Sequence, residues 1–219
     1  MAILTPINDW FSKQGWKPIP FQKQTWKAYL SGESGIIQVP TGSGKTYGAV
    51  MGPIAQMLDE EGSLSGLRLL YITPLRALSR DIEASIQRPI EEMNWPITVE
   101  SRTGDTKSSV KSRQIKKMPN ILITTPESLS VLLSYKNSAK RFGNLRCVIL
   151  DEWHELMSSK RGTQTELCMT RLRELNPTVQ TWAISATLGN LQEAAEAATG
   201  AGSHPVVIQS KIERKTVIT

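Results

Sequence analysis

The feature that most constrains the fold is a series of short apolar runs that recur along the chain. Seven runs rich in β-branched residues occur at 35–39, 67–72, 97–101, 121–124, 146–150, 180–184 and 205–209. Most are continuously apolar instead of alternating, a pattern typical of strands that helices cover on both faces. The sequence therefore predicts an α/β fold with a mainly parallel central sheet of about seven strands and helices on both faces.

The segments between these runs are predicted to be helical, at 46–58, 76–92, 108–117, 126–134, 163–174 and 190–198. Pro126 suits the first turn of a helix, and Asn190 has the side chain of an N-cap. We expect three regions: a helical region at 1–34, an α/β domain at 35–210 and the start of a linker at 211–219.

Composition limits the functional classes only loosely. Lys and Arg outnumber Asp and Glu by 26 to 20, which favours a polyanionic partner or an acidic surface without deciding between them. The N-terminus does not resemble a signal peptide, and no uncharged apolar run is long enough to cross a bilayer, so we expect a cytoplasmic location and no membrane partner. Cys147 and Cys168 fall in a predicted strand and helix, and we expect them to be reduced core residues.

The segment VPTGSGKT, residues 39–46, lies where the first predicted strand ends and a helix begins. Glycines at such a point let backbone N–H groups converge on phosphates, and the helix adds its positive end. Lys45 then reaches the β- and γ-phosphates of a nucleotide, and the Thr46 hydroxyl binds Mg²⁺. The predicted nucleotide-binding residues are Thr41, Gly42, Ser43, Gly44, Lys45 and Thr46. Val39 replaces the first glycine of the general motif, and the alternative is a glycine-rich turn that ends by chance in Lys-Thr.

Two acidic residues, Asp151 and Glu152, directly follow the apolar run at 146–150. The carboxyl ends of parallel strands face the ligand crevice of an α/β sheet. We expect Asp151 to bind Mg²⁺ and Glu152 to orient and deprotonate the attacking water, so the predicted catalytic residues are these two and Lys45. The alternative is that the acidic pair caps a helix or lies in a loop. We interpret His154 as a coupling residue instead of a zinc ligand, because no cysteine cluster accompanies it.

Seven segments, taken in order, resemble the first-domain motifs of superfamily 2 DExH-box helicases. They are GWKPIPFQ (the Q motif), VPTGSGKT (I), TPLRAL (Ia), RTGD (Ic), TTPES (Ib), DEWHE (II) and SATLGN (III). The sequences of these motifs are similar to those of the Lhr-like branch. They are most similar to bacterial ligase-associated DExH-box helicases, because DEWHEL is followed by SKRGTQTEL. The resemblance implies a RecA-like P-loop NTPase domain with ATP and Mg²⁺ as cofactors.

The resemblance also assigns roles outside the phosphate loop. It places the adenine-reading glutamine at Gln22, with Gln24 as the competing candidate, and Trp16 near the base. Coupling between the nucleotide and nucleic-acid sites falls to His154, Ser185, Ala186 and Thr187. The implied nucleic-acid contacts are Pro74, Leu75, Arg76, Thr103, Gly104, Asp105, Thr125, Pro126 and Glu127. These follow predicted strands, so they should line one sheet edge and grip phosphates without reading bases.

Two further groups of residues have more than one interpretation. The basic residues Lys107, Lys111, Arg113, Lys116 and Lys117 either extend the electrostatic track for nucleic acid or form a solvated helix face. We interpret the tryptophans at 10, 26, 95, 153 and 182 as packing residues instead of platforms for bases.

The resemblance implies the first motor domain of an ATP-dependent DNA helicase that moves 3′ to 5′ on single-stranded DNA in repair. It further implies a second RecA-like domain, accessory domains and a ligase or nuclease partner. Since the second domain supplies an arginine finger worth roughly 10³ to 10⁵ in turnover, we expect the isolated chain to be nearly inactive. The alternatives are an RNA helicase, a P-loop ATPase that moves no nucleic acid and a non-catalytic binding module.

Overall fold

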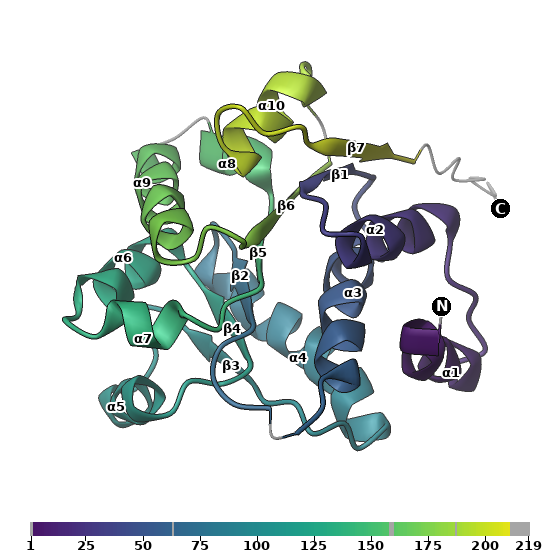
Figure 1. Ribbon diagram of the computed structural model, residues 1–219, viewed down its shortest axis with the longest axis horizontal. Helices are drawn as coiled ribbons and strands as arrows, with labels where there is room; N and C mark the ends of the chain where they lie inside the picture. The colour runs from purple at the N-terminus through teal and green to yellow at the C-terminus, as the bar shows by residue number, and fades with distance from the viewer. Residues whose placement is uncertain (1, 63, 158–159, 187, 211–219) are drawn as a thin grey trace, which may run out of the picture.

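The computed structural model describes residues 2–62, 64–157, 160–186 and 188–210. Its centre is a parallel sheet of seven strands in the order β3-β4-β2-β5-β6-β1-β7 (Figure 1). The strands are β1 (Gly35–Gln38), β2 (Leu69–Ile72), β3 (Val99–Arg102), β4 (Ile121–Thr124), β5 (Cys147–Leu150), β6 (Gln180–Ser185) and β7 (Val206–Gln209). Each lies within or beside a predicted apolar run, so the predicted α/β fold and its parallel sheet are confirmed.

The helices fill the connections between strands. They are α1 (Thr5–Lys13), α2 (Pro20–Leu30), α3 (Lys45–Asp59), α4 (Arg76–Glu92), α5 (Ser108–Lys116), α6 (Pro126–Ser134), α7 (Ser138–Phe142), α8 (Trp153–Met157), α9 (Lys160–Leu175) and α10 (Leu191–Thr199), after a 3₁₀ turn at Ala2–Leu4. The bounds of α4 and α6 match the predicted ones, and the Asn190 side chain caps α10 as predicted by accepting from the Glu193 N–H. The short helices α7 and α8 were not predicted, because five residues are too few to show a helical period.

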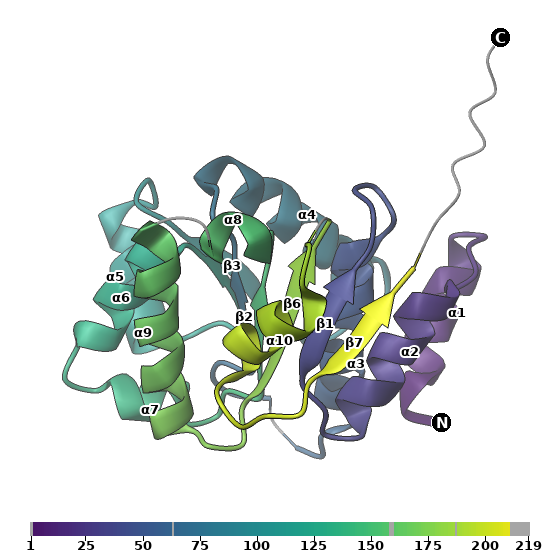
Figure 2. The same cartoon turned by 90° about the horizontal axis from the view of Figure 1, so that it is seen from above.

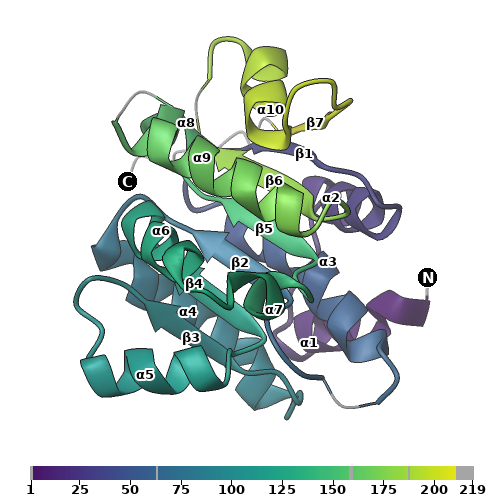
Figure 3. The same ribbon diagram turned by 60° about the vertical axis from the view of Figure 1, so that its left-hand side comes forward.

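Two helical layers cover the sheet, as Figure 3 shows with α6 and α9 on the near side and α3 and α4 behind. Successive strand residues point to opposite layers, as β2 illustrates. Leu69 and Tyr71 join the core beneath α1 to α4, whereas Leu70 and Ile72 join the core beneath α6 to α10. Burial on both faces explains why the strand sequences are continuously apolar.

The N-terminal helices pack on the same core as the sheet. Gly48 of α3 makes this close packing possible, because a Cβ there would lie 2.6 Å from the ring of Phe21 in α2. The Trp26 indole N–H donates to the Tyr47 carbonyl at 3.0 Å, and Trp10 meets the Tyr47 ring edge to face at 5.0 Å. The interpretation of the tryptophans as packing residues is confirmed: those at 10, 26, 153 and 182 are buried, and the half-buried one at 95 packs against the core.

Both cysteines are buried free thiols, as predicted. Burial raises the pKa of the Cys168 thiol to about 11, so the thiolate that would react or bind a metal is disfavoured at neutral pH. Among the described helices, none combines the length and the apolar character that a bilayer span requires.

Candidate functional site

All seven strands run in parallel, so their carboxyl ends meet at one edge of the sheet. Figure 2 shows the arrowheads of β1, β6 and β7 pointing toward this edge, where α8 also lies. The loops after β1, β2, β3, β4, β5 and β6 carry the predicted motifs. The topology therefore brings together, along one edge, residues that are more than a hundred positions apart in sequence.

The phosphate loop connects β1 directly to α3. Gly42 and Gly44 have φ angles of 77° and 78°, a left-handed conformation that favours glycine. Space is also short at Gly44, where a Cβ would lie 2.9 Å from the Gln22 amide nitrogen. The next residue, Lys45, begins α3, so the first N–H groups of the helix, which have no partner within the helix itself, lie next to the loop. This arrangement of donors suits the binding of a triphosphate.

Gln22 lies against this loop and Gln24 does not. The Gln22 side chain is buried; its amide donates to the Gly44 carbonyl at 3.1 Å, and its oxygen accepts from the Ile19 N–H at 3.0 Å. Gln24 is exposed on α2. Trp16 is 43% exposed and meets Trp10 edge to face. Of the two candidate glutamines, the structure therefore places Gln22 beside the nucleotide loop.

The acidic pair directly follows β5. The buried Asp151 donates its N–H to the Ile72 carbonyl at 2.8 Å, and its carboxylate accepts from the Glu152 N–H at 3.0 Å. Glu152 has a φ of 45°, a conformation that costs a non-glycine residue free energy and is concentrated at functional sites. The Glu152 carboxylate forms an ion pair with the Lys45 ammonium, so the phosphate loop and the acidic pair are in direct contact.

Burial changes the protonation behaviour of Asp151. Burial raises the pKa of the Asp151 carboxyl from its ordinary value of 3.8 to about 6, an effect that the nearby Lys45 charge opposes and the Glu152 charge reinforces. A buried carboxylate of this kind is stabilised by a cation. Asp151 and the Thr46 hydroxyl are the hard oxygen ligands that Mg²⁺ prefers. The buried Ser43 hydroxyl has no hydrogen-bond partner among the described residues, which suits a loop that binds phosphate oxygens.

His154 connects the acidic pair to the end of β6. Its Nδ1 atom lies 3.0 Å from the Ser185 hydroxyl and 3.6 Å from a Glu152 carboxylate oxygen. The Ser185 carbonyl also accepts from the N–H of Val39, the first residue of the phosphate loop, at 3.2 Å. The predicted coupling residues His154 and Ser185 thus contact each other and the nucleotide motifs. Ala186 is half-buried beside them, and Thr187 lies outside the described residues.

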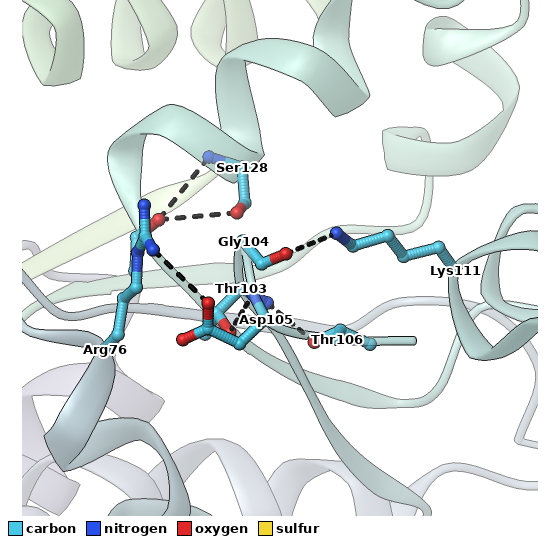
Figure 4. Close-up of polar contacts among 8 residues, drawn as sticks. Arg76, Thr103, Gly104, Asp105, Thr106, Lys111 and Ser128 are labelled. Atoms are coloured by element: carbon cyan, nitrogen blue, oxygen red, sulfur yellow. Dashed lines mark hydrogen bonds and ion pairs between the residues drawn. The ribbon is translucent and has the colours of Figure 1, made fainter. Parts of the chain in front are cut away.

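Further along the same edge, the loops after β2 and β3 meet through Arg76. Figure 4 shows its guanidinium turned toward the Asp105 carboxylate, with 3.3 Å between the nearest nitrogen and oxygen. The guanidinium also lies against Gly104, where a Cβ would be 2.9 Å from it. Asp105 donates its N–H to the Thr103 hydroxyl at 3.3 Å. Arg76 and Asp105 are both exposed, so polymer phosphates have access to this part of the edge.

The loop after β4 completes the row of predicted nucleic-acid contacts. The Thr125 hydroxyl accepts from the Ser128 N–H at 3.4 Å and caps α6. Pro126 and Glu127 form the first turn of that helix. In the neighbouring loop after β2, Pro74 is buried and Leu75 is exposed. The structure thus brings the predicted residues of three separate motifs to one edge.

The five basic residues on and beside α5 differ in their contacts. Lys111 donates to the Gly104 carbonyl at 2.8 Å, beside the predicted nucleic-acid contacts. Arg113 instead pairs with Glu100 at 2.9 Å, and the other three basic residues are exposed. Both interpretations, the electrostatic track and the solvated face, therefore stay open for these residues.

Sequence reasoning missed a role for Arg161, which lies in the segment SKRGTQTEL. Its Nε atom pairs with a Glu127 carboxylate oxygen at 2.8 Å, and its Nη1 atom donates to the Pro74 carbonyl at 3.0 Å. The available signal was an Arg-Gly pair close after the acidic motif, but no periodicity or spacing indicates what such an arginine contacts.

Comparison with known proteins agrees with this geometry. Residues 19–194 match the sequence profile of the DEAD/DEAH box helicases. The chain belongs to this family. It is 36% identical to ATP-dependent helicase Lhr-Core protein 2 of Thermococcus barophilus over 87% of this chain and 24% of that protein. Lhr-like proteins are thus among its relatives, as the motifs predicted, and the chain spans about a quarter of that relative's length.

Solved structures give the same result for the fold. The Mycobacterium smegmatis helicase Lhr, bound to ssDNA and AMP-PNP, superposes with a TM-score of 0.86 at 30% identity, covering 94% of this chain and 28% of that one. Mss116p bound to ssRNA and AMP-PNP has a TM-score of 0.83 at 25% identity, covering 95% of this chain and 43% of that one. The domain is therefore RecA-like, as predicted.

Proposed function

We propose that this chain is the first motor domain of an ATP-dependent helicase that translocates on single-stranded DNA. The observation that carries the proposal is the series of contacts from Lys45 through Glu152 and His154 to Ser185. It lies on the same sheet edge as Arg76 and the other predicted phosphate contacts. Nucleotide and nucleic acid would thus bind to neighbouring loops of one sheet, so a change at the nucleotide could reach the nucleic-acid contacts through His154 and Ser185.

At the nucleotide end, each residue has a separate role. Lys45 exchanges its Glu152 partner for the β- and γ-phosphates, and Gln22 reads the adenine edge. Released from Lys45, Glu152 orients the attacking water and accepts its proton. Thr46 and Asp151 would hold Mg²⁺, and the metal would neutralise charge on the phosphates.

At the nucleic-acid end, Arg76 pairs with a phosphate. Hydroxyl and N–H groups near Gly104 and Thr125 contact the neighbouring phosphates. Such contacts provide grip without base identity. The choice of DNA is supported by the likeness to the Lhr structure that contains ssDNA. RNA is the second candidate, because Mss116p with ssRNA shares the fold almost as closely.

The motor requires more than this domain. We propose that a second RecA-like domain and accessory domains belong to the full-length protein, since the chain matches only about a quarter of its Lhr-Core relative. The second domain would supply an arginine finger worth roughly 10³ to 10⁵ in turnover, so the isolated chain should hydrolyse ATP near background. The resemblance to ligase-associated helicases further supports 3′-to-5′ movement, a DNA repair role and a ligase or nuclease partner.

ATP turnover by the full-length protein tests the proposal. We expect single-stranded DNA to stimulate turnover strongly, and a matched RNA strand to compete weakly. Equal competition would favour the RNA candidate. If neither polymer binds nor stimulates turnover, the chain is a P-loop ATPase of another kind and the nucleic-acid part of the proposal is wrong.

A further inference from the structure

Arg161 makes two contacts that join separate parts of the predicted nucleic-acid face. One is the ion pair with Glu127 in the first turn of α6, and the other is the hydrogen bond to the Pro74 carbonyl in the loop after β2. A planar guanidinium can make both contacts at once, because its N–H groups point in fixed, diverging directions. The two loops contribute neighbouring phosphate contacts in the proposed function, so a bridge between them sets their spacing.

The residue after Arg161 anchors this arginine to the nucleotide side of the domain. Gly162 is buried, and a Cβ there would lie only 2.3 Å from the Leu156 carbonyl oxygen in α8. The start of α9 therefore packs directly on the short helix α8, which also carries His154. On its other side, α9 shares a core cluster with α6, through Met169 and Leu129.

The positive charge of Arg161 has a second effect, on the neighbouring Glu127 carboxylate. Glu127 lies in the first turn of α6, beside Thr125, where a phosphate of the nucleic acid is expected to bind. Although burial raises the pKa of Glu127, backbone and Thr125 hydrogen bonds and the Arg161 charge bring it below its ordinary value. The carboxylate is therefore ionised at neutral pH. An unpaired negative charge there would repel a phosphate, and Arg161 offsets it.

We propose that Arg161 is a positioning residue that holds the Pro74 loop and the start of α6 at a fixed spacing for successive phosphates of the nucleic-acid strand. This inference rests on the proposed function and adds to it a residue that does not touch the nucleotide. Gly162 serves the same purpose by keeping α9 close enough to α8 for Arg161 to reach both loops.

The test compares Arg161→Ala, Arg161→Lys and Arg171→Ala in the full-length protein. Arg171 is a matched control, because it lies on the same helix, pairs with Glu174 at 2.6 Å and has the same 47% side-chain exposure. ATP turnover is measured against single-stranded DNA concentration and against ATP concentration. We expect Arg161→Ala to raise the half-saturating DNA concentration roughly fivefold or more, with a smaller change in KM for ATP.

Two further variants make the result specific. Arg161→Lys should give an intermediate value, because an ammonium cannot maintain both contacts in the same geometry. Adding Glu127→Gln to Arg161→Ala should recover part of the lost DNA affinity, because it removes the unpaired carboxylate. Arg171→Ala should match the wild type.

Two outcomes would overturn the inference. One is an Arg161→Ala protein whose DNA dependence matches that of Arg171→Ala. The other is an equal loss of ATP affinity, DNA affinity and thermal stability, which would show a merely structural role. Failure of the proposed function looks different, because the wild-type protein itself would then show no DNA dependence.

Discussion

Replacement of Asp151 by asparagine should change how the stability of the domain depends on pH. Burial raises the pKa of this carboxyl from 3.8 to about 6 in the folded protein. Since one pKa unit corresponds to about 1.4 kcal/mol, ionising Asp151 in the fold costs about 3 kcal/mol relative to the unfolded chain. The folded state keeps the proton longer, so the free energy of unfolding falls as pH rises through both pKa values, from about 3 to about 7. Above that range the cost is constant.

The assay is urea unfolding of this chain at several pH values, with EDTA and without nucleotide. Asparagine retains an oxygen that can accept from the Glu152 N–H but carries no charge. The stability of Asp151→Asn relative to wild type should therefore rise by about 3 kcal/mol between about pH 3 and about pH 7 and then level off. Asp105→Asn, which alters an exposed carboxylate, is the control and should follow the wild-type curve. A constant difference between Asp151→Asn and wild type across this range would refute the reasoning.

Three further predictions concern the motor and the packing behind it. In the full-length protein, Lys45→Ala should abolish ATP binding in calorimetry, whereas Glu152→Gln should bind ATP but not turn it over; normal turnover by the latter would make the assigned base wrong. His154→Ala should bind both ATP and DNA yet lose most DNA stimulation of turnover, and unchanged stimulation would exclude its coupling role. Gly48→Val should destabilise the chain by roughly 1–3 kcal/mol in urea unfolding, because a Cβ there would lie 2.6 Å from Phe21; wild-type stability would contradict the close packing of α2.

Sequence was sufficient for the features that follow from local pattern. The continuously apolar runs predicted the parallel strands, since residues such as Leu69 and Leu70 must both be buried on opposite faces. Strand ends then predicted which loops share an edge. The ion pair between Lys45 and Glu152 shows that the loops after β1 and β5 meet at this edge.

The contacts that sequence could not predict depend on side-chain direction across the fold. Arg161 reaches Pro74, 87 residues earlier, and no local pattern encodes that distance. The sequence left Gln22 and Gln24 as candidates for the adenine contact, and the packing of α2 against Gly44 and Gly48 brings Gln22 to the loop. The basic residues at 107–117 were ambiguous for the same reason, because the contacts of Lys111 with Gly104 and of Arg113 with Glu100 depend on the fold.

A crystal structure of this chain with a non-hydrolysable ATP analogue and Mg²⁺ would test the central claim most directly. We predict that the β- and γ-phosphates lie within hydrogen-bonding distance of Lys45 and the N–H groups at 42–46. The Asp151 carboxylate should face the metal, and Glu152, released from Lys45, should face the γ-phosphate. A triphosphate bound away from this loop, or a Lys45 that keeps its ion pair with Glu152 while nucleotide is bound, would contradict the account.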